Sequence, residues 1–310
     1  MIKTPLNLYD EIASNKRKTF LIILLFPLVL AGVIFATFLL IFLIGSNGNN
    51  EILWQEIHYF SLIITGVTLA FALIWTAIAW FTGDQIILNS ADAHEISRST
   101  HPEIFVLVEN LTIATGLPLP RIYIIDDNSL NAFATGRDPE HSSLALTKGI
   151  INKLNRAELE GVIGHELGHI ANHDIRLTML VATSIGAISL MGQILMRMGR
   201  GRRNGKGNFL PIIGLALVVY GAIFAPLIMY ALSRRREFQA DATSAYMTRN
   251  PLALASALEK ISSDSRVEVL DGKDAIAAAC IAFPGDKLSL SSLFSTHPPI
   301  KDRIEKLRAM

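Results

Sequence analysis

The sequence predicts a mainly α-helical fold with a small β-sheet and additional transmembrane helices. Of its 310 residues, 51% are hydrophobic and only 18% are charged, and the mean hydropathy is +0.40. Ordinary soluble domains carry about 25% charged residues, so this composition is typical of a membrane protein. The apolar residues gather in long uncharged segments, whereas the polar stretch between them mixes helix-type and strand-type patterns. A net charge of +1 gives no global field, so nucleic acid is not an expected partner.

Two apolar segments near the amino terminus predict transmembrane helices. The first runs from about Phe20 to Ile44 and the second from about Tyr59 to Phe81, and neither contains a charged residue. Each is long enough to cross the hydrocarbon core, which needs about 20 residues. The basic run Lys16–Lys18 precedes the first segment, whereas the connector between the two holds only acidic charges. The positive-inside rule therefore places both ends of this pair in the cytoplasm.

The polar region that follows is expected to fold in water. Within it, Ile104–Ala114 has a helical pattern, the β-branched run Arg121–Ile125 predicts a strand, and Ser143–Thr147 predicts a second short strand. Helices and a few strands in one stretch indicate an α+β arrangement.

Two further apolar segments, about Leu177 to Met198 and Phe209 to Leu232, predict a second hairpin. The Gly-rich loop between them is basic and contains Arg197, Arg200, Arg202, Arg203 and Lys206. If both segments cross the membrane from the cytoplasm, this loop ends on the far side, against the positive-inside rule. Three paths stay open: full crossing, entry into the bilayer without delivery of the loop, and packing against the soluble domain. Five small or polar residues weaken the third segment and favour packing of helix on helix: Ser184, Gly186, Ser189, Gly192 and Gln193.

The segment from His165 to His169 reads His-Glu-Leu-Gly-His and carries the most specific chemistry. Two histidines four positions apart stand on one face of a helix, so both can bind a single Zn²⁺. Glu166 then lies beside the metal, where a carboxylate can accept a proton. Asn155 is a plausible N-cap of this helix, with Glu158 at the third helical position as in a capping box.

A simpler interpretation of this motif is a helix with two hydrogen-bonded core histidines and an exposed Glu166. The surrounding residues are apolar, and polar groups on such a helix are costly unless they are paired or bound to a metal. The metal site is therefore favoured. Leu167 and Gly168 are not ligands, and we expect these two positions to vary freely.

A catalytic zinc ion needs three protein ligands and one open position. Glu237 is the candidate third ligand, and Asp241, one turn later, is expected to accept the free ring N–H of a ligand histidine. Taken alone, the pair fits better as acidic residues on a solvated helix beside arginines, but beside the histidine motif that interpretation loses. Position favours the ligand role, because His169 precedes the third apolar segment and Glu237 follows the fourth. A hairpin that returns to the same membrane face brings the two together.

Four motifs in this order resemble those of the HtpX-type membrane metalloproteases, which are related to the CAAX prenyl proteases. They are Asn131–Gly136, His165–His169, Glu237–Asp241 and Ser295–Ile300. The resemblance extends from the two amino-terminal spans to the last helix around Arg303–Glu305, so it covers nearly the whole chain.

This resemblance implies a zinc-dependent endopeptidase of the bacterial inner membrane, with one Zn²⁺ per chain. By carry-over, His165, His169 and Glu237 are the ligands and Glu166 is the catalytic base. The implied fold is an α+β zincin-like protease domain attached to transmembrane helices. The implied protein is multi-pass, faces the cytoplasm with its protease domain, and acts on unfolded or damaged membrane proteins in quality control and stress response.

The resemblance also assigns substrate binding to Asn131, Ala132, Phe133 and Ala134. These residues would form an edge strand, and an exposed strand edge can pair with an extended peptide of almost any sequence. From the residues alone, the segment is equally well a plain turn that ends at Gly136.

Two residues near the carboxyl terminus are further candidates. His297 is constrained by the prolines that follow it and could donate a hydrogen bond to the oxyanion of the reaction. It is equally well a loop histidine that caps the last helix. Arg303 is a candidate to pair with Asp241 or with substrate.

The sequence divides into a membrane anchor, residues 1–82, and a zinc protease domain, residues 83–310, which the apolar hairpin 177–232 interrupts. Three other functions compete with the quality-control protease: a prenyl-peptide processing protease, a non-catalytic membrane scaffold that contains zinc, and a transporter. The two clear spans contain no ionisable residue within their cores to mark a substrate path, which disfavours the transporter. Structural zinc sites are usually closed by four ligands and rich in cysteine, and no cysteine lies near this motif. The protease is therefore the favoured function.

Overall fold

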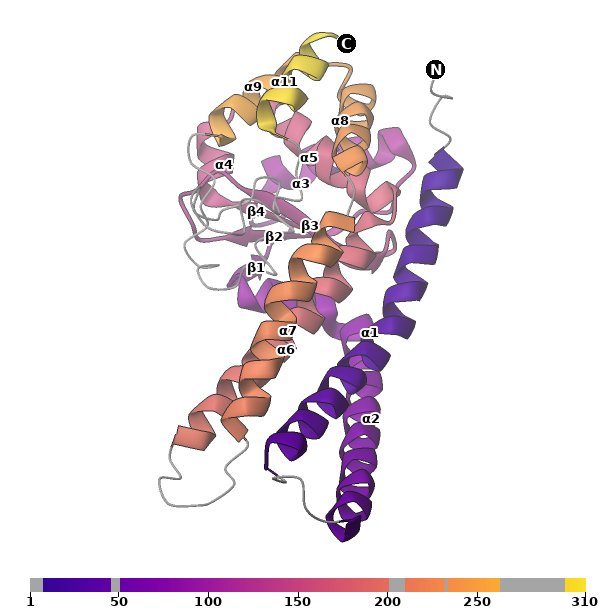
Figure 1. The fold of residues 1–310 in the computed structure, drawn as a ribbon. Coiled ribbons are helices and arrows are strands. Elements are labelled where there is room, and N and C mark those ends of the chain that lie inside the picture. The colour runs from indigo at the N-terminus through magenta and orange to yellow at the C-terminus, as the bar shows by residue number, and fades with distance from the viewer. Residues whose placement is uncertain (1–7, 46–50, 201–209, 232–233, 263–298) are drawn as a thin grey trace. The chain divides into compact units, whose positions relative to one another are not determined.

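The computed structural model describes residues 8–45, 51–200, 210–231, 234–262 and 299–310 (Figure 1). These residues are mostly helical and contain a small mixed β-sheet, which confirms the predicted fold class. The chain forms two compact units. The first, here called the sheet unit, comprises residues 1–16, 79–183 and 226–310, and the second, the helical unit, comprises residues 17–78 and 184–225.

The sheet unit is built around a mixed sheet of four strands within the described residues. The strands are β1 (Ala93–Glu95), β2 (Arg121–Ile125), β3 (Ala132–Asp138) and β4 (His141–Thr147), in the spatial order β1-β2-β4-β3. β2 and β4 are parallel, whereas β1 and β3 pair antiparallel with their neighbours. Both predicted strands are confirmed, one as β2 and one as most of β4. β3 lies at an edge of the sheet.

One face of the sheet carries the core of this unit. Side chains that alternate along the strands, such as Ile124 of β2 and Leu146 of β4, are buried there. The helices α3 (Pro102–Thr115) and α5 (Arg156–Ala171) contribute to the same core, and α3 covers the predicted helix of this region. α3 ends at Gly116, whose backbone is left-handed with φ of 69°, a conformation that favours glycine.

Helix α5 begins with the capping box that the sequence predicts. The Asn155 side chain accepts the backbone N–H of Glu158, and the Glu158 carboxylate accepts the backbone N–H of Asn155, each at 2.9 Å. Glu158 also accepts hydrogen bonds from Ser256 and Lys260 of α9 (Pro251–Ile261) at 2.7 and 2.6 Å. Burial opposes its ionisation, but these hydrogen bonds lower the pKa of Glu158. One carboxylate therefore joins the start of α5 to α9.

The helices α8 (Arg234–Thr248) and α11 (Ile300–Arg308) pack on the other helices of the sheet unit. α8 runs along α5, and α11 packs on α9 near the carboxyl terminus (Figure 1). The ammonium group of Lys306 on α11 lies 3.3 Å from the centre of the Phe238 ring on α8. This cation–π contact joins the last helix to α8.

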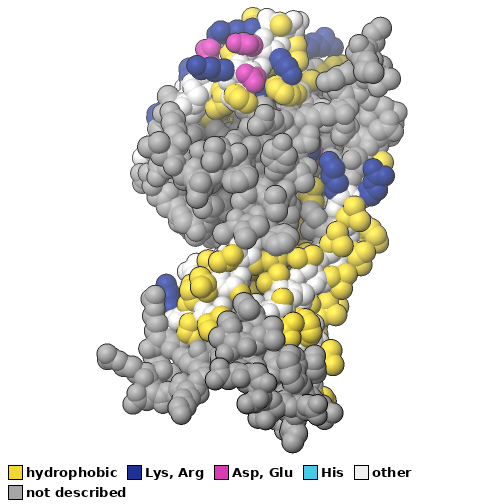
Figure 2. Space-filling view, viewed as in Figure 1, with side chains coloured by type: hydrophobic (Ala, Val, Ile, Leu, Met, Phe, Trp, Pro, Cys, Tyr) yellow, Lys and Arg dark blue, Asp and Glu magenta, His cyan; other side chains and the backbone are white. Residues whose placement is uncertain are grey.

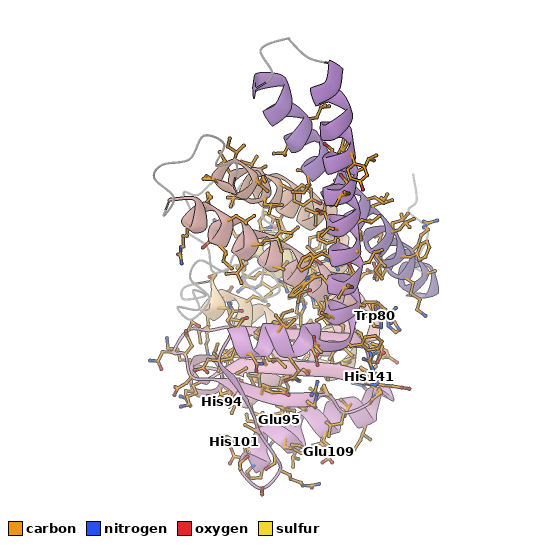
Figure 3. The ribbon with its side chains drawn as sticks, turned by 90° about the horizontal axis from the view of Figure 1, so that it is seen from below. Trp80, His94, Glu95, His101, Glu109 and His141 are labelled. Atoms are coloured by element: carbon orange, nitrogen blue, oxygen red, sulfur yellow. The ribbon has the colours of Figure 1, made fainter. Side chains whose placement is uncertain are left out.

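The end of α2 (Glu51–Ser90) belongs to the sheet unit and lies against the sheet. Arg121, the first residue of β2, forms an ion pair with Asp84 of this helix. Figure 3 shows Trp80 of α2 beside His141 at the start of β4. The second membrane helix therefore continues directly into contacts with the strands.

The helical unit consists of apolar helices that share one core. It contains parts of α1 (Leu8–Gly45), α2, α6 (Asp174–Arg200) and α7 (Leu210–Ala231). All four helices contribute buried side chains to this core: Phe26, Leu30 and Ile34 of α1, Ala72 of α2, Ile188 of α6, and Leu217 and Tyr220 of α7. Figure 2 shows hydrophobic side chains over much of the described surface of these helices.

Three helices among the described residues are long and apolar enough to cross a membrane. They contain the stretches Asn15–Thr37 in α1, Ser61–Ser90 in α2 and Asp174–Arg197 in α6, and α7 contains a shorter apolar stretch, Pro211–Gly221. The two predicted amino-terminal spans and the apolar hairpin thus all form helices. The predicted boundary at residue 82 and the path of the hairpin through the bilayer stay predictions.

Helices α6 and α7 approach each other closely where both carry glycine. A Cβ atom on Gly192 would lie 2.8 Å from the carbonyl oxygen of Gly214, and one on Gly214 would lie 2.7 Å from the carbonyl oxygen of Gly192. Only residues without a side chain fit this contact. The sequence-based expectation of helix-on-helix packing at Gly192 is therefore confirmed.

We predict that Glu158→Ala destabilises the protein through loss of the capping box and of the hydrogen bonds to α9. The expected cost is about 2 kcal/mol, which lowers the thermal unfolding midpoint in detergent by about 4–8 °C. Glu160→Ala is the matched control, because it removes only an exposed ion pair with Arg156 on the same helix. Equal midpoints for the two variants would contradict this account of Glu158.

Candidate metal centre

Helix α5 presents His165, Glu166 and His169 toward one point. The side chain of His165 is fully buried, Glu166 is 2% exposed, and the His169 side chain is 15% exposed. The two rings stand edge to face with centres 4.7 Å apart, and their Nε2 atoms are 3.2 Å from each other. The spacing of four residues brings the histidines together as the sequence predicts.

Helix α8 brings Glu237 to the same point. Its carboxylate oxygens lie 3.7 Å from Nε2 of His165 and 3.6 Å from Nε2 of His169. One ligand atom from each of these three residues lies within 4.8 Å of the other two. Of the groups of three or more histidines, cysteines and acidic residues in the described part of the chain, this one has metal-binding geometry.

Small residues allow α8 to lie so close to α5. A Cβ atom on Gly164 would meet Oγ of Ser244 at 3.0 Å, and one on Gly168 would meet Cα of Ala240 at 3.2 Å. Ser244 also donates a hydrogen bond of 2.6 Å to the carbonyl of Gly161 on α5. The expectation that Gly168 varies freely is therefore wrong, because this position lies against the backbone of α8.

Leu167 does not vary freely either. Its side chain is fully buried in the core of the sheet unit. A change of volume at such a position leaves a cavity or forces neighbouring side chains aside. Both residues inside the motif are thus fixed by packing, although neither can bind a metal.

The other ring nitrogen of each histidine faces a carboxylate. Nδ1 of His165 lies 3.0 Å from Asp241, and Nδ1 of His169 lies 3.0 Å from Asp174. A carboxylate only accepts hydrogen bonds, so both Nδ1 atoms carry the proton. In the neutral rings both Nε2 atoms are then unprotonated, and they lie 3.2 Å apart. They are placed to share one cation, and Nη2 of Arg303 also lies 3.3 Å from Nε2 of His165.

This arrangement fits a zinc ion. Two nitrogen ligands at about 2.0–2.1 Å from one tetrahedral zinc ion lie about 3.3–3.4 Å apart, close to the observed 3.2 Å. The charges agree with a divalent cation as well. Among the described residues, the carboxylates of Glu166, Asp174, Glu237 and Asp241 are accompanied by the guanidinium groups of Arg236 and Arg303. Four negative groups against two positive ones leave a charge of about −2 before histidine protonation.

Arg303 of α11 completes the support of this centre. It is fully buried and donates two hydrogen bonds to Asp241, at 2.9 and 2.7 Å. Another of its nitrogens lies 3.5 Å from Glu237. Burial opposes the charge of Arg303, but the adjacent carboxylates raise its pKa further. The predicted pairing of Arg303 with Asp241 is confirmed.

Glu166 is placed for proton transfer. Its Oε1 atom is buried and has no hydrogen-bond partner among the described residues. Burial raises the pKa of Glu166 above its usual range, although the nearby histidines oppose this. A carboxylate with a raised pKa is better matched to proton transfer near neutral pH.

The structure places the remaining candidates as follows. Asn131 precedes β3, and Ala132, Phe133 and Ala134 lie in this edge strand, so the predicted strand is confirmed at the sheet edge. All four side chains are buried, which leaves the backbone as the part that could contact a peptide. His297 lies outside the described residues.

Sequence reasoning missed Asp174, which contacts His169 as Asp241 contacts His165. The available signal was its position, since it lies five residues after His169 at the start of the next helix. The turn between the two helices places His173 in a left-handed conformation, with φ of 56°. This turn returns Asp174 to the histidine.

Comparison with known proteins agrees with this geometry. Residues 98–310 match peptidase family M48. The chain belongs to this family.

Curated relatives match over nearly the whole chain. A protease HtpX homolog of Dictyoglomus turgidum is 40% identical over 315 residues, which cover 99% of this chain and 96% of the relative. A protease HtpX homolog of Streptococcus uberis is 41% identical over 317 residues, covering 98% and 100%. With its apolar helices, the chain is thus a bacterial membrane metalloendopeptidase.

Among solved structures, S. mikatae Ste24p is similar to this chain. The match covers 95% of this chain and 67% of that one, with 17% sequence identity and a TM-score of 0.44.

We predict that Gly168→Val weakens zinc binding by more than tenfold. The added side chain must push α8, and with it Glu237, away from the histidines. Gly186→Val is the matched control, since a Cβ atom there has no neighbour within 4 Å. Zinc content and chelator competition in detergent measure the effect, and wild-type affinity in Gly168→Val would refute the packing account.

We predict that zinc affinity falls about tenfold for each unit by which the pH is lowered between 8 and 6. Burial and Arg303 oppose protonation of His165, but hydrogen bonds to Asp241 and Glu237 raise the pKa of His165 to about 9 in the metal-free protein. Below that pH a proton occupies the nitrogen that zinc needs. Chelator competition at several pH values tests this, and a flat profile would contradict it.

Proposed function

We propose that this chain is a zinc-dependent endopeptidase that uses Glu166 to activate water. The observation that carries the proposal is the convergence of His165, His169 and Glu237 on one point. The buried Glu166, whose Oε1 has no hydrogen-bond partner among the described residues, interacts electrostatically with all three. Three protein ligands leave one position of a tetrahedral zinc ion open, as catalytic sites require. One zinc ion per chain follows from this single group.

The residues divide the chemistry of peptide hydrolysis among them. The contribution of a bound zinc ion is Lewis-acid polarisation of the scissile carbonyl and acidification of a water molecule. Glu166 accepts a proton from the attacking water and delivers it to the leaving amine. Asp241, held by Arg303, keeps the His165 ring in the tautomer whose Nε2 can bind the metal.

We propose that β3 binds the substrate backbone. It is an edge strand in the same unit as the metal centre, and it packs against α5, which carries both histidines. An extended peptide can add to such an edge through main-chain hydrogen bonds alone. This mode of binding suits a protease that acts on many unfolded sequences. His297, as donor to the oxyanion, stays part of the proposal.

We further propose that the enzyme acts on damaged or misfolded membrane proteins at the cytoplasmic face of the bacterial inner membrane. The basic run Lys16–Lys18 before the first span supports this orientation. The membrane helices and the metal centre lie in one continuous chain, so substrates in or near the bilayer are within reach. In this proposal residues 1–82 form the anchor and residues 83–310 the protease domain, with hairpin 177–232 inserted in it.

We predict that Glu166→Gln binds zinc at about one ion per chain, yet cleaves an unfolded model substrate at least 100-fold more slowly. Glutamine keeps the shape of the side chain but cannot accept the proton. Metal analysis and a cleavage assay on the detergent-purified protein measure both quantities. Glu160→Gln on the same helix is the control and retains full activity, because its side chain pairs only with Arg156 at the surface.

Two outcomes would overturn the proposal. Equal cleavage by wild type and Glu166→Gln would remove Glu166 from the reaction. Full activity and stoichiometric zinc in Glu237→Ala would remove the third ligand. A parallel assay with a prenylated peptide tests the alternative substrate class, and preference for that peptide would reassign the substrate while keeping the metal centre.

A further inference from the structure

Each of the two proposed ligand histidines has a carboxylate at its Nδ1 atom, and these two carboxylates are supported by different parts of the chain. Asp241 holds His165, and the buried Arg303 holds Asp241. Asp174 holds His169 through a contact of 3.0 Å between Oδ2 and Nδ1. Asp174 is only 2% exposed, so its second carboxylate oxygen also needs a partner inside the protein.

That partner is Asn15, a residue of the amino-terminal helix α1. Its side-chain nitrogen donates a hydrogen bond of 2.6 Å to Oδ1 of Asp174 and one of 3.1 Å to the backbone carbonyl of Asn172. An amide nitrogen has two hydrogens, so both are used. Asn15 is 2% exposed, and Arg236 lies farther from Asp174, at 3.5 Å.

We propose that Asp174 is a positioning residue for the ligand His169, and that Asn15 holds Asp174 in its orientation. This inference rests on the proposed zinc site. A carboxylate behind a ligand histidine fixes the ring and its tautomer and makes the other nitrogen a better ligand. Asn15 fixes the carboxylate in turn, because its nitrogen binds both Asp174 and the end of α5 that carries His169.

The consequence concerns the role of α1. This helix is continuous from Leu8 to Gly45, but its residues up to 16 belong to the sheet unit and those from 17 onward belong to the helical unit. The first membrane helix thus begins with a residue that supports the metal centre. Displacement of the start of α1 along its axis removes Asn15 from Asp174 and weakens metal binding.

A purely structural role of Asn15 is the competing explanation. The carbonyl of Asn172 lies at the end of α5, where helix carbonyls lack partners within the helix. A residue that only satisfies this carbonyl contributes to stability and leaves the electronic environment of the metal unchanged. The two roles therefore differ in what happens to the bound metal when Asn15 is replaced.

The test uses the full-length protein in detergent and two readouts of the metal itself. These are zinc affinity by chelator competition and the visible absorption spectrum of the cobalt-substituted protein. We expect Asp174→Asn and Asn15→Asp to weaken zinc binding about 10–100-fold and to change the cobalt spectrum. Asn15→Asp has the shape of the original side chain, but it places a carboxylate against Asp174 where a donor was.

Two further variants keep the test decisive. Asn15→Ala removes both donors without adding a charge, so its zinc affinity should lie between those of wild type and Asn15→Asp. If Asn15→Asp fails to fold, Asn15→Ala replaces it in the test. Asn250→Asp is the matched control. Asn250 caps α9 through its side-chain oxygen, which aspartate also provides, so this variant should match wild type.

Each result has one meaning. Wild-type zinc affinity and cobalt spectra in folded Asp174→Asn and Asn15→Asp would overturn the inference. A lower unfolding midpoint for both, with no change at the metal, would also overturn it and leave a structural role. If the wild-type protein itself binds no zinc, the proposed function fails, and that result is distinct from failure of the inference.

Discussion

The close contact between α5 and α8 is the constraint on which the rest of this structure depends. Two of the three proposed ligands lie on α5 and the third lies on α8, so the proposed metal centre depends on contact between these helices. A Cβ atom on Gly164 or Gly168 would lie only 3.0 Å from Ser244 or 3.2 Å from Ala240, so a larger residue at either position must push its neighbour aside. A larger residue at either glycine would push α8, and with it Glu237, away from the histidines.

The close contact between α5 and α8 also brings several charged side chains together inside the protein. Each buried carboxylate at the centre would be costly without a partner, and Asp174, Glu237 and Asp241 each have one on another element. Arg303 of α11 joins Asp241 and Glu237, while Asn15 of α1 joins Asp174 to the end of α5. The two ends of the chain thus meet the site from different helices. A metal ion supplies the positive charge that the protein groups lack.

The local features of this protein could be predicted from its sequence. The β-branched run of β2, the capping box of Asn155 and Glu158, and the histidine pair all depend on residues within one element, so their spacing alone determines them. The helix α9 was not predicted, although Asn250 before Pro251 is an N-cap followed by proline at the first helical position. β1 is only three residues long, which is too short for a periodic pattern.

Contacts between distant segments could not be predicted in the same way. Asn15 and Asp174 are separated by 159 positions, and nothing in either local sequence indicates the other. The motif alone predicts Gly168 as a free position, because it shows the chemistry of this position and not its packing. Glu237 is predicted as the third ligand because a hairpin returns the chain to its starting face, a topological argument that does not depend on local pattern.

The central claim is that two histidines of α5 and one carboxylate of α8 bind the same zinc ion. X-ray absorption at the zinc edge of the purified protein tests this most directly, because it reports the number and type of the nearest atoms. The account predicts two imidazole nitrogens at about 2.0–2.1 Å with oxygen atoms completing the shell, and loss of bound zinc in Glu237→Ala. A shell without two imidazoles, or an unchanged spectrum in Glu237→Ala, would contradict it.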